Sequence, residues 1–208
     1  MEEKIYFDNG STSWPKAPGV QEAVSELLKN GAFNINRGNY AGAYEVESVV
    51  LETRDQLVQL FHGTDSRNVI FTPGITYSLN YFIKGFLKNG DHVLVSGLEH
   101  NAVMRPLEQM KLAGVDYDIV PVDEEGNLDP EDLRERIRIN TKAVIMTHAS
   151  NVCGTVVPIR EIGSICKEYG LFFVVDTAQS AGTLPVDMQE CQIDFLAFTA
   201  HKGLLGPQ

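Results

Sequence analysis

The chain has 208 residues, which is enough for one domain with a substantial hydrophobic core. Its 28 Asp and Glu residues outnumber its 17 Lys and Arg residues, which gives a net charge of −11, and the basic residues form no cluster. This balance argues against nucleic acid or an anionic membrane as a partner. Its three cysteines form no disulfide framework, and no Cys/His spacing fits a metal site. Without a signal peptide or an apolar run long enough to span a bilayer, the chain is expected to be cytoplasmic.

The first third of the chain predicts two helices joined by a loop. Residues 18–29 begin with proline and end before Asn30-Gly31, as helices often do. Residues 32–43 are rich in Asn and Gly and predict a loop. Residues 44–61 predict a longer helix with valine and leucine on one broad face.

From residue 68 onward, short apolar runs alternate with helical stretches. This alternation predicts an α/β domain with a mostly parallel sheet and helices on both faces. The expected strands are 68–72, 92–96, 117–120, 143–147, 172–176 and 195–199. The expected helices between them are 76–87, 101–112, 130–137 and 158–169.

Polar segments follow several of these strands, and the carboxyl ends of parallel strands converge on one crevice where ligands bind. Gly74, Ile75 and Thr76 open a helix and offer N–H groups and a hydroxyl to an anion, although a plain turn capped by threonine explains them equally well. His100 can stack on an aromatic ring or move a proton, and a locally hydrogen-bonded polar loop is the alternative. Asn151 can donate to a phenolate oxygen or serve as a turn residue.

The strongest signal is a carboxylate and a lysine that follow two successive apolar strands. Asp176 comes directly after Phe172–Val175 and needs a partner, because an acid there is poorly solvated. A protonated pyridine nitrogen would satisfy it, and so would an ordinary salt bridge. Lys202 lies at the mouth of the next strand, where its amine can attack an aldehyde. This pair predicts a planar, charged cofactor held by a covalent imine, with nearby groups for its phosphate or ring oxygen from Thr199, His201 and Gln179.

The combined pattern resembles the pyridoxal phosphate (PLP) site of class V aminotransferases, and among them it is most similar to the cysteine desulfurases. The resemblance covers essentially the whole chain and implies the large domain of a PLP-dependent transferase. The segments that carry it are Tyr6–Thr12, Asn36–Gly38, Thr72–Thr76, Glu99–Asn101, Ser150–Thr155, Val175–Ser180 and Asp194–Gly203.

The resemblance assigns a role to each candidate residue. Lys202 would bind PLP covalently and later take the α-proton, and His100 would stack on the ring. Asp176 would bind the pyridine nitrogen, with Asn151 and Gln179 near the ring hydroxyl. The phosphate would be held by Thr76 with the neighbouring backbone amides of Gly74 and Ile75, and by Thr199 and His201. No metal is expected.

The implied reaction converts L-cysteine to L-alanine and leaves a persulfide on the enzyme. The family also implies a homodimer and a protein that accepts the sulfur. In the family, a further strand, a nucleophilic cysteine and an arginine for the substrate carboxylate follow the lysine motif. The three cysteines of this chain occupy other positions, and Cys153 is expected to be a small buried residue.

We therefore expect residues 1–208 to comprise an N-terminal segment and most of the PLP-binding large domain of a longer protein, without its C-terminal domain. Unpaired strand edges and exposed apolar surface should result. Two alternatives stay open at this point. One is another PLP enzyme of the superfamily, such as a selenocysteine lyase or an aminotransferase. The other is a non-catalytic remnant that binds PLP or dimerises.

Overall fold

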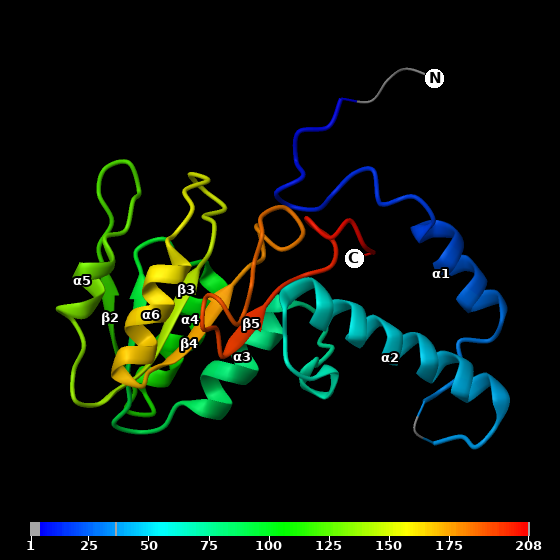
Figure 1. Ribbon diagram of the computed structural model, residues 1–208, viewed down its shortest axis with the longest axis horizontal. Coiled ribbons are helices and arrows are strands. Elements are labelled where there is room, and N and C mark those ends of the chain that lie inside the picture. The colour runs from blue at the N-terminus through cyan, green and yellow to red at the C-terminus, as the bar shows by residue number, and fades with distance from the viewer. Residues whose placement is uncertain (1–4, 36, 208) are drawn as a thin grey trace.

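The computed structural model describes residues 5–35 and 37–207, and its centre is a five-stranded sheet (Figure 1). All five strands run parallel, in the order β2-β1-β3-β4-β5. The strands are β1 (His92–Ser96), β2 (Asp116–Val120), β3 (Thr141–Thr147), β4 (Phe172–Asp176) and β5 (Phe195–Ala197). The helices are α1 (Val20–Lys29), α2 (Ala41–Phe61), the short 3₁₀ helix η1 (Ser66–Asn68), α3 (Ile75–Phe86), α4 (Asn101–Lys111), α5 (Pro130–Arg134) and α6 (Ile159–Tyr169).

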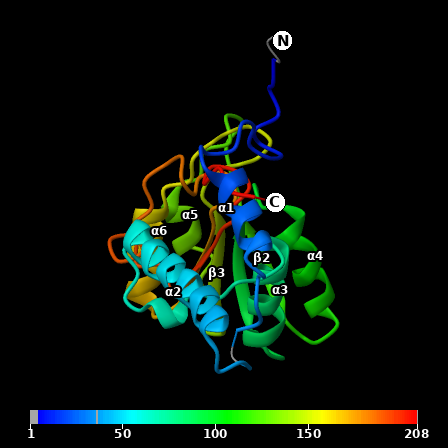
Figure 2. The same cartoon turned by 90° about the vertical axis from the view of Figure 1, so that its right-hand side faces the viewer.

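Helices cover both faces of the sheet, as the alternating pattern predicts. Successive strand residues point to opposite faces, so Val93 and Val95 pack with α3 and α4, whereas Leu94 packs in a second cluster with α5 and α6. Figure 2 shows α3 and α4 on one side of the strands and α5 and α6 on the other. The predicted α/β class, with its mostly parallel sheet between two helical layers, is confirmed.

The expected strand at residues 68–72 is wrong. Residues 66–68 form the 3₁₀ helix η1, and residues 69–72 belong to no helix or strand. A strand needs the hydrogen-bonding edge of a neighbour, and apolar composition alone does not supply one. Smaller differences concern the ends of elements. Helix α2 begins at Ala41, within the expected loop, α5 ends at Arg134 instead of residue 137, and β5 ends at Ala197 instead of residue 199.

The N-terminal helices contribute little to the core. Helix α1 buries no residue, and the expected apolar face of α2 buries only its last residue, Phe61, while Val49 and Leu60 are half exposed. Figure 1 shows α1 and much of α2 extending away from the sheet. In the part of the chain that the structure describes, no helix combines the length and apolarity needed to cross a membrane.

Helix α6 approaches the segment before β5 closely at Gly163. A Cβ placed on Gly163 would lie 1.9 Å from the carbonyl oxygen of Cys191, which is backbone and cannot rotate away. We predict that Gly163→Ala lowers the free energy of unfolding by about 1–3 kcal/mol, the usual cost of overpacking. Gly85→Ala is the matched control, because a Cβ there meets nothing within 4 Å. Urea denaturation should show no loss for Gly85→Ala, and equal stability of the two variants would contradict the prediction.

Candidate active site

The candidate residues gather where the parallel strands end. His100 follows β1, Asn151 follows β3, Asp176 is the last residue of β4, and Lys202 follows β5. Strands β1, β3, β4 and β5 are consecutive neighbours in the sheet, so these four positions lie side by side at the carboxyl-terminal end of the sheet. Ligands bind at this end of the strands in open α/β sheets.

Asp176 is almost completely buried, with 2% of its surface exposed. The N–H of Ala178 donates to its Oδ1 at 2.9 Å, and the described residues place no hydrogen bond on Oδ2. Burial raises the pKa of Asp176, while the Ala178 hydrogen bond and the electrostatic effects of the nearby His100 and Lys202 lower it in part. The carboxylate therefore lies in the field of both predicted catalytic residues and retains an oxygen for a ligand.

Lys202 is partly buried in a turn closed by two backbone hydrogen bonds. The N–H of Leu205 donates to the carbonyl of Lys202 at 2.9 Å, and the N–H of Gly206 donates to that of Ala200 at 2.8 Å. Burial lowers the pKa of Lys202, and the charge of Asp176 opposes this shift. A lower pKa makes more of the amine neutral, which is the nucleophilic form.

His201 and Thr199 flank this turn, and both also line the large groove described below. Burial lowers the pKa of His201, and the charges of Lys202 and Lys16 lower it further. Its Nδ1 is buried without a hydrogen-bond partner among the described residues. Thr199 is buried at 8% exposure.

His100 is the N-cap of α4, and its Nδ1 accepts a hydrogen bond from the N–H of Ala102 at 3.0 Å. A neutral ring held in this way carries its proton on Nε2. This hydrogen bond also holds the imidazole ring of His100 in one position relative to the start of α4. His100 and Thr76 line one small cavity, so α3 and α4 bring these two predicted residues together.

Gly74 and Ile75 open α3 as predicted. Gly74 has a φ of 137°, a conformation that favours glycine, and its carbonyl accepts from the N–H groups of Tyr77 and Ser78. Thr72 Oγ1 lies 2.8 Å from Ser78 Oγ and fastens the loop to the helix.

Asn151 lies exposed on the loop after β3. Gln179 Nε2 donates to the carbonyl of Gly10 at 3.1 Å and so links the site to the N-terminal segment. In the segment 36–38, which carries part of the resemblance, Arg37 is exposed, and Asn36 lies outside the described residues.

Glu99, beside His100, received no role from the sequence. Part of the residue is exposed, but its carboxylate bridges two strand ends: Ser96 Oγ donates to Oε1 at 2.5 Å and the N–H of Thr147 donates at 2.7 Å. Its Oε2 is buried without a hydrogen-bond partner among the described residues. Burial raises the pKa of Glu99 to about 8, with the charge of Asp176 adding to the rise. The acid after the predicted strand was the available signal, but its burial depends on the fold.

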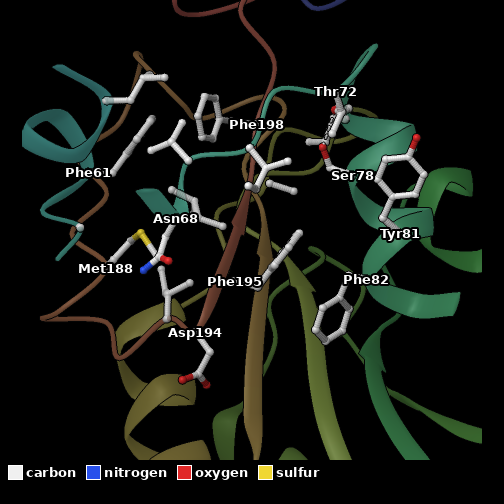
Figure 3. A pocket seen from close by; sticks show the side chains of 18 of the residues that line it. Phe61, Asn68, Thr72, Ser78, Tyr81, Phe82, Met188, Asp194, Phe195 and Phe198 are labelled. Atoms are coloured by element: carbon white, nitrogen blue, oxygen red, sulfur yellow. Dashed lines mark hydrogen bonds between the residues drawn. The ribbon is translucent and has the colours of Figure 1, made fainter. Parts of the chain in front are cut away.

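A groove of about 1790 Å³ lies along the outer edge of β5. Figure 3 shows Phe61 and Phe198 on one side of it and Tyr81 and Phe82 on the other. Residues 69–72 border the groove, where Ile70 and Phe71 are 70% and 52% exposed. Within the described residues, β5 pairs only with β4. The unpaired edge and the exposed apolar surface predicted from the sequence are therefore present.

The expectation that Cys153 is buried is wrong. Cys153 is exposed on the turn after β3, whereas Cys166 and Cys191 are buried. Hydrogen bonds from the hydroxyls of Ser150 and Thr155 lower the pKa of the Cys153 thiol to about 7, because they stabilise the thiolate. Apolar sequence around a cysteine does not determine whether a turn exposes it.

The sequence model of the aminotransferase class-V family matches residues 5–208. The chain belongs to this family. This class-V chain is 34% identical over 212 residues to cysteine desulfurase IscS of Dictyoglomus turgidum. The alignment covers 100% of this chain and 53% of that protein. The chain is 35% identical over 210 residues to a probable cysteine desulfurase of Pyrococcus abyssi, and covers 99% of itself and 52% of that protein.

Solved structures agree with this assignment. The class-V chain matches the apo cysteine desulfurase of Thermococcus onnurineus NA1 with a TM-score of 0.90 and 33% identity, covering 98% of itself and 51% of that chain. It matches SspA, solved in complex with cysteine, with a TM-score of 0.91 and 27% identity, covering 99% of itself and 59% of that chain. The chain spans about half the length of the curated relatives it matches.

Glu99 makes the stability of this class-V domain depend on pH. Between its ordinary pKa of 4.5 and its folded pKa of about 8, the folded state holds a proton that the unfolded state has lost. The free energy of unfolding should therefore fall as the pH rises from about 5 to about 8, and Glu99→Gln should remove this loss. Urea midpoints of the two proteins should diverge across this range in favour of Glu99→Gln. A constant difference would contradict the prediction, and exposed Glu124→Gln is the control.

Cys153 should be the most reactive thiol of the chain. Its pKa of about 7 and its exposure favour the thiolate, while burial raises the pKa of Cys166 to about 12 and that of Cys191 as well. Mass spectrometry after iodoacetamide treatment should find Cys153 labelled first, with a rate that rises to half its maximum near pH 7. Faster labelling of either buried cysteine in the folded protein would disprove this.

Proposed function

We propose that this chain is the cofactor-binding part of a PLP-dependent enzyme of the cysteine desulfurase type. The observation that carries the proposal is the placement of Asp176 and Lys202 at one sheet edge, where each shifts the pKa of the other. A buried carboxylate with a free oxygen suits a protonated ring nitrogen, and a partly buried lysine suits an aldehyde. The proposal is supported by the family and by relatives that are named cysteine desulfurases.

The donor set fits the rest of PLP. The N–H groups at the start of α3 and the Thr76 hydroxyl can hold a phosphate, together with Thr199 and His201. His100 stacks on the ring in the proposed arrangement, and Asn151 and Gln179 lie near its hydroxyl. The described residues include no group of three or more His, Cys, Asp or Glu side chains able to hold a metal ion.

In this proposal, bound PLP withdraws electrons from the α-carbon of an amino acid so that its α-proton can leave. Asp176 accepts the ring N–H in a charge-assisted hydrogen bond and keeps that nitrogen protonated. Lys202 Nζ holds the cofactor at rest and takes the α-proton during turnover. His100 covers the ring and limits the access of water.

The whole protein would convert L-cysteine to L-alanine. The carbon–sulfur bond of the substrate breaks and its sulfur forms a sulfur–sulfur bond with a cysteine thiol of the enzyme, while a hydrogen replaces sulfur on the β-carbon. L-Cysteine and one thiol thus become L-alanine and one persulfide, and atoms and charge balance. We also propose that the protein acts in the cytoplasm as a homodimer and passes its sulfur to an acceptor protein. The complex of SspA with cysteine supports cysteine as the substrate.

Lys202 provides the direct test of this function. Addition of PLP should give the wild-type chain a visible absorption band, and Lys202→Ala should lose that band completely because no other amine occupies this position. Lys167→Ala on the exposed surface of α6 is the control and should keep it. A band that survives in Lys202→Ala would refute the lysine assignment.

The reaction itself is tested by incubating the whole protein with L-cysteine. Production of alanine with enzyme-bound sulfane sulfur is expected. A keto acid with the pyridoxamine form of the cofactor would instead identify an aminotransferase, and release of alanine only from selenocysteine would identify a selenocysteine lyase. A visible band without turnover of any amino acid would identify a non-catalytic PLP-binding protein.

A further inference from the structure

The carbonyl oxygen of His201, directly before Lys202, is approached by four donors from one distant segment. They are the N–H of Ser13 at 2.8 Å, and Ser13 Oγ, Thr12 Oγ1 and Lys16 Nζ, each at 3.0 Å. The donors lie 185 or more residues away in the sequence, so only the folded chain brings them to this atom.

Lys16 is the centre of this network. Its ammonium group has three N–H donors, and it contacts Thr12 Oγ1 at 3.0 Å, Ser13 Oγ at 3.1 Å and the His201 carbonyl at 3.0 Å. Both hydroxyls that accept from Lys16 donate to the same carbonyl, so each contact polarises the next. No salt bridge to Lys16 occurs among the described residues, and hydrogen bonding to neutral oxygens accounts for its position there.

These contacts bear directly on the orientation of Lys202. The peptide unit is planar, so fixing the oxygen of His201 also fixes the nitrogen and the Cα of Lys202. The N–H of Ala17 adds a hydrogen bond to the carbonyl of Leu205 at 3.0 Å, on the far side of the same turn. Figures 1 and 2 both show the N-terminal segment lying over the C-terminal turn.

Among the described residues, few other hydrogen bonds attach this segment to the domain. Helix α1, which follows it, buries no residue. Ser13, by contrast, is buried at 3% exposure. Residues 10–17, which we call the N-terminal strap, are therefore held to the domain mainly through the Lys202 turn and through the hydrogen bond from Gln179 to Gly10.

We propose that Lys16 is a positioning residue that sets the orientation of Lys202, and that closure of the N-terminal strap and PLP binding strengthen each other. The first half of the proposal concerns the chain alone, whereas the second half rests on the proposed function. Thermodynamic linkage requires the coupling to be reciprocal: PLP on Lys202 must tighten the strap by the factor by which the strap tightens PLP.

The first experiment needs no cofactor. Lys16→Met keeps most of the stem and removes all three donors, Lys16→Arg keeps the charge and the donors, and Lys29→Met on α1 is the control. Hydrogen exchange at the Ser13 amide should be at least about 10-fold faster in Lys16→Met, because the charged hydrogen bonds that hold the strap closed are lost. Lys16→Arg should restore most of the protection, and Lys29→Met should match the wild type. Unchanged exchange in Lys16→Met would overturn the proposal.

The second experiment adds PLP and follows the visible band. Lys16→Met should need about 10-fold more PLP for half-maximal absorbance, with the same final absorbance. PLP should slow exchange at Ser13 in the wild type and leave it unchanged in Lys202→Ala. Faster exchange in Lys16→Met with unchanged PLP affinity would overturn the coupling.

Two further outcomes distinguish a failure of this proposal from a failure of the proposed function. Absence of any band in the wild type would refute the proposed function, and the cofactor-free exchange measurement would still decide the role of Lys16. Should Lys16→Met fail to fold, Thr12→Val removes one of the relaying hydroxyls and leaves the ammonium in place. That variant should give a smaller rise in Ser13 exchange, and no rise would overturn the proposal.

Discussion

The uniform direction of the strands is the constraint on which the candidate site depends. A parallel sheet places the carboxyl ends of all its strands at the same end of the sheet. Segments about 100 residues apart in sequence therefore meet there. His100, Asp176 and Lys202 each follow or end a strand of this kind. If one of the strands ran in the opposite direction, the polar residues that follow it would lie at the opposite end of the sheet.

The same convergence removes charged groups from water. Burial raises the pKa values of Asp176 and Glu99 and lowers that of Lys202, so all three shifts favour the neutral form. Opposite charges within the site reduce the cost, as the mutual effects of Asp176 and Lys202 demonstrate. Such shifts accumulate at functional sites because a ligand or a partner charge can compensate for the burial.

Strand β5 illustrates the limit of local sequence preference. Residues 69–72 have the apolar composition of a strand, and β5 offers an open edge, but a groove separates the two. Hydrogen bonds between strands require a separation of about 5 Å, so neither segment can complete the other across this space. Ile70 and Phe71 consequently remain exposed on one side of the groove, and Phe195 and Phe198 are only partly buried on the other.

Hydrophobic periodicity and turn residues act locally, so the amino-acid pattern alone was enough to predict the α/β class, all five strands to within two residues, and the polar groups that follow them. The exposure of Cys153, the buried carboxylate of Glu99 and the absence of a strand at residues 69–72 were decided only in the tertiary structure. Lys16 is the clearest case, since its contact with His201 joins residues 185 positions apart. Contacts of that kind depend on where the folded chain returns in space, and no local pattern encodes them.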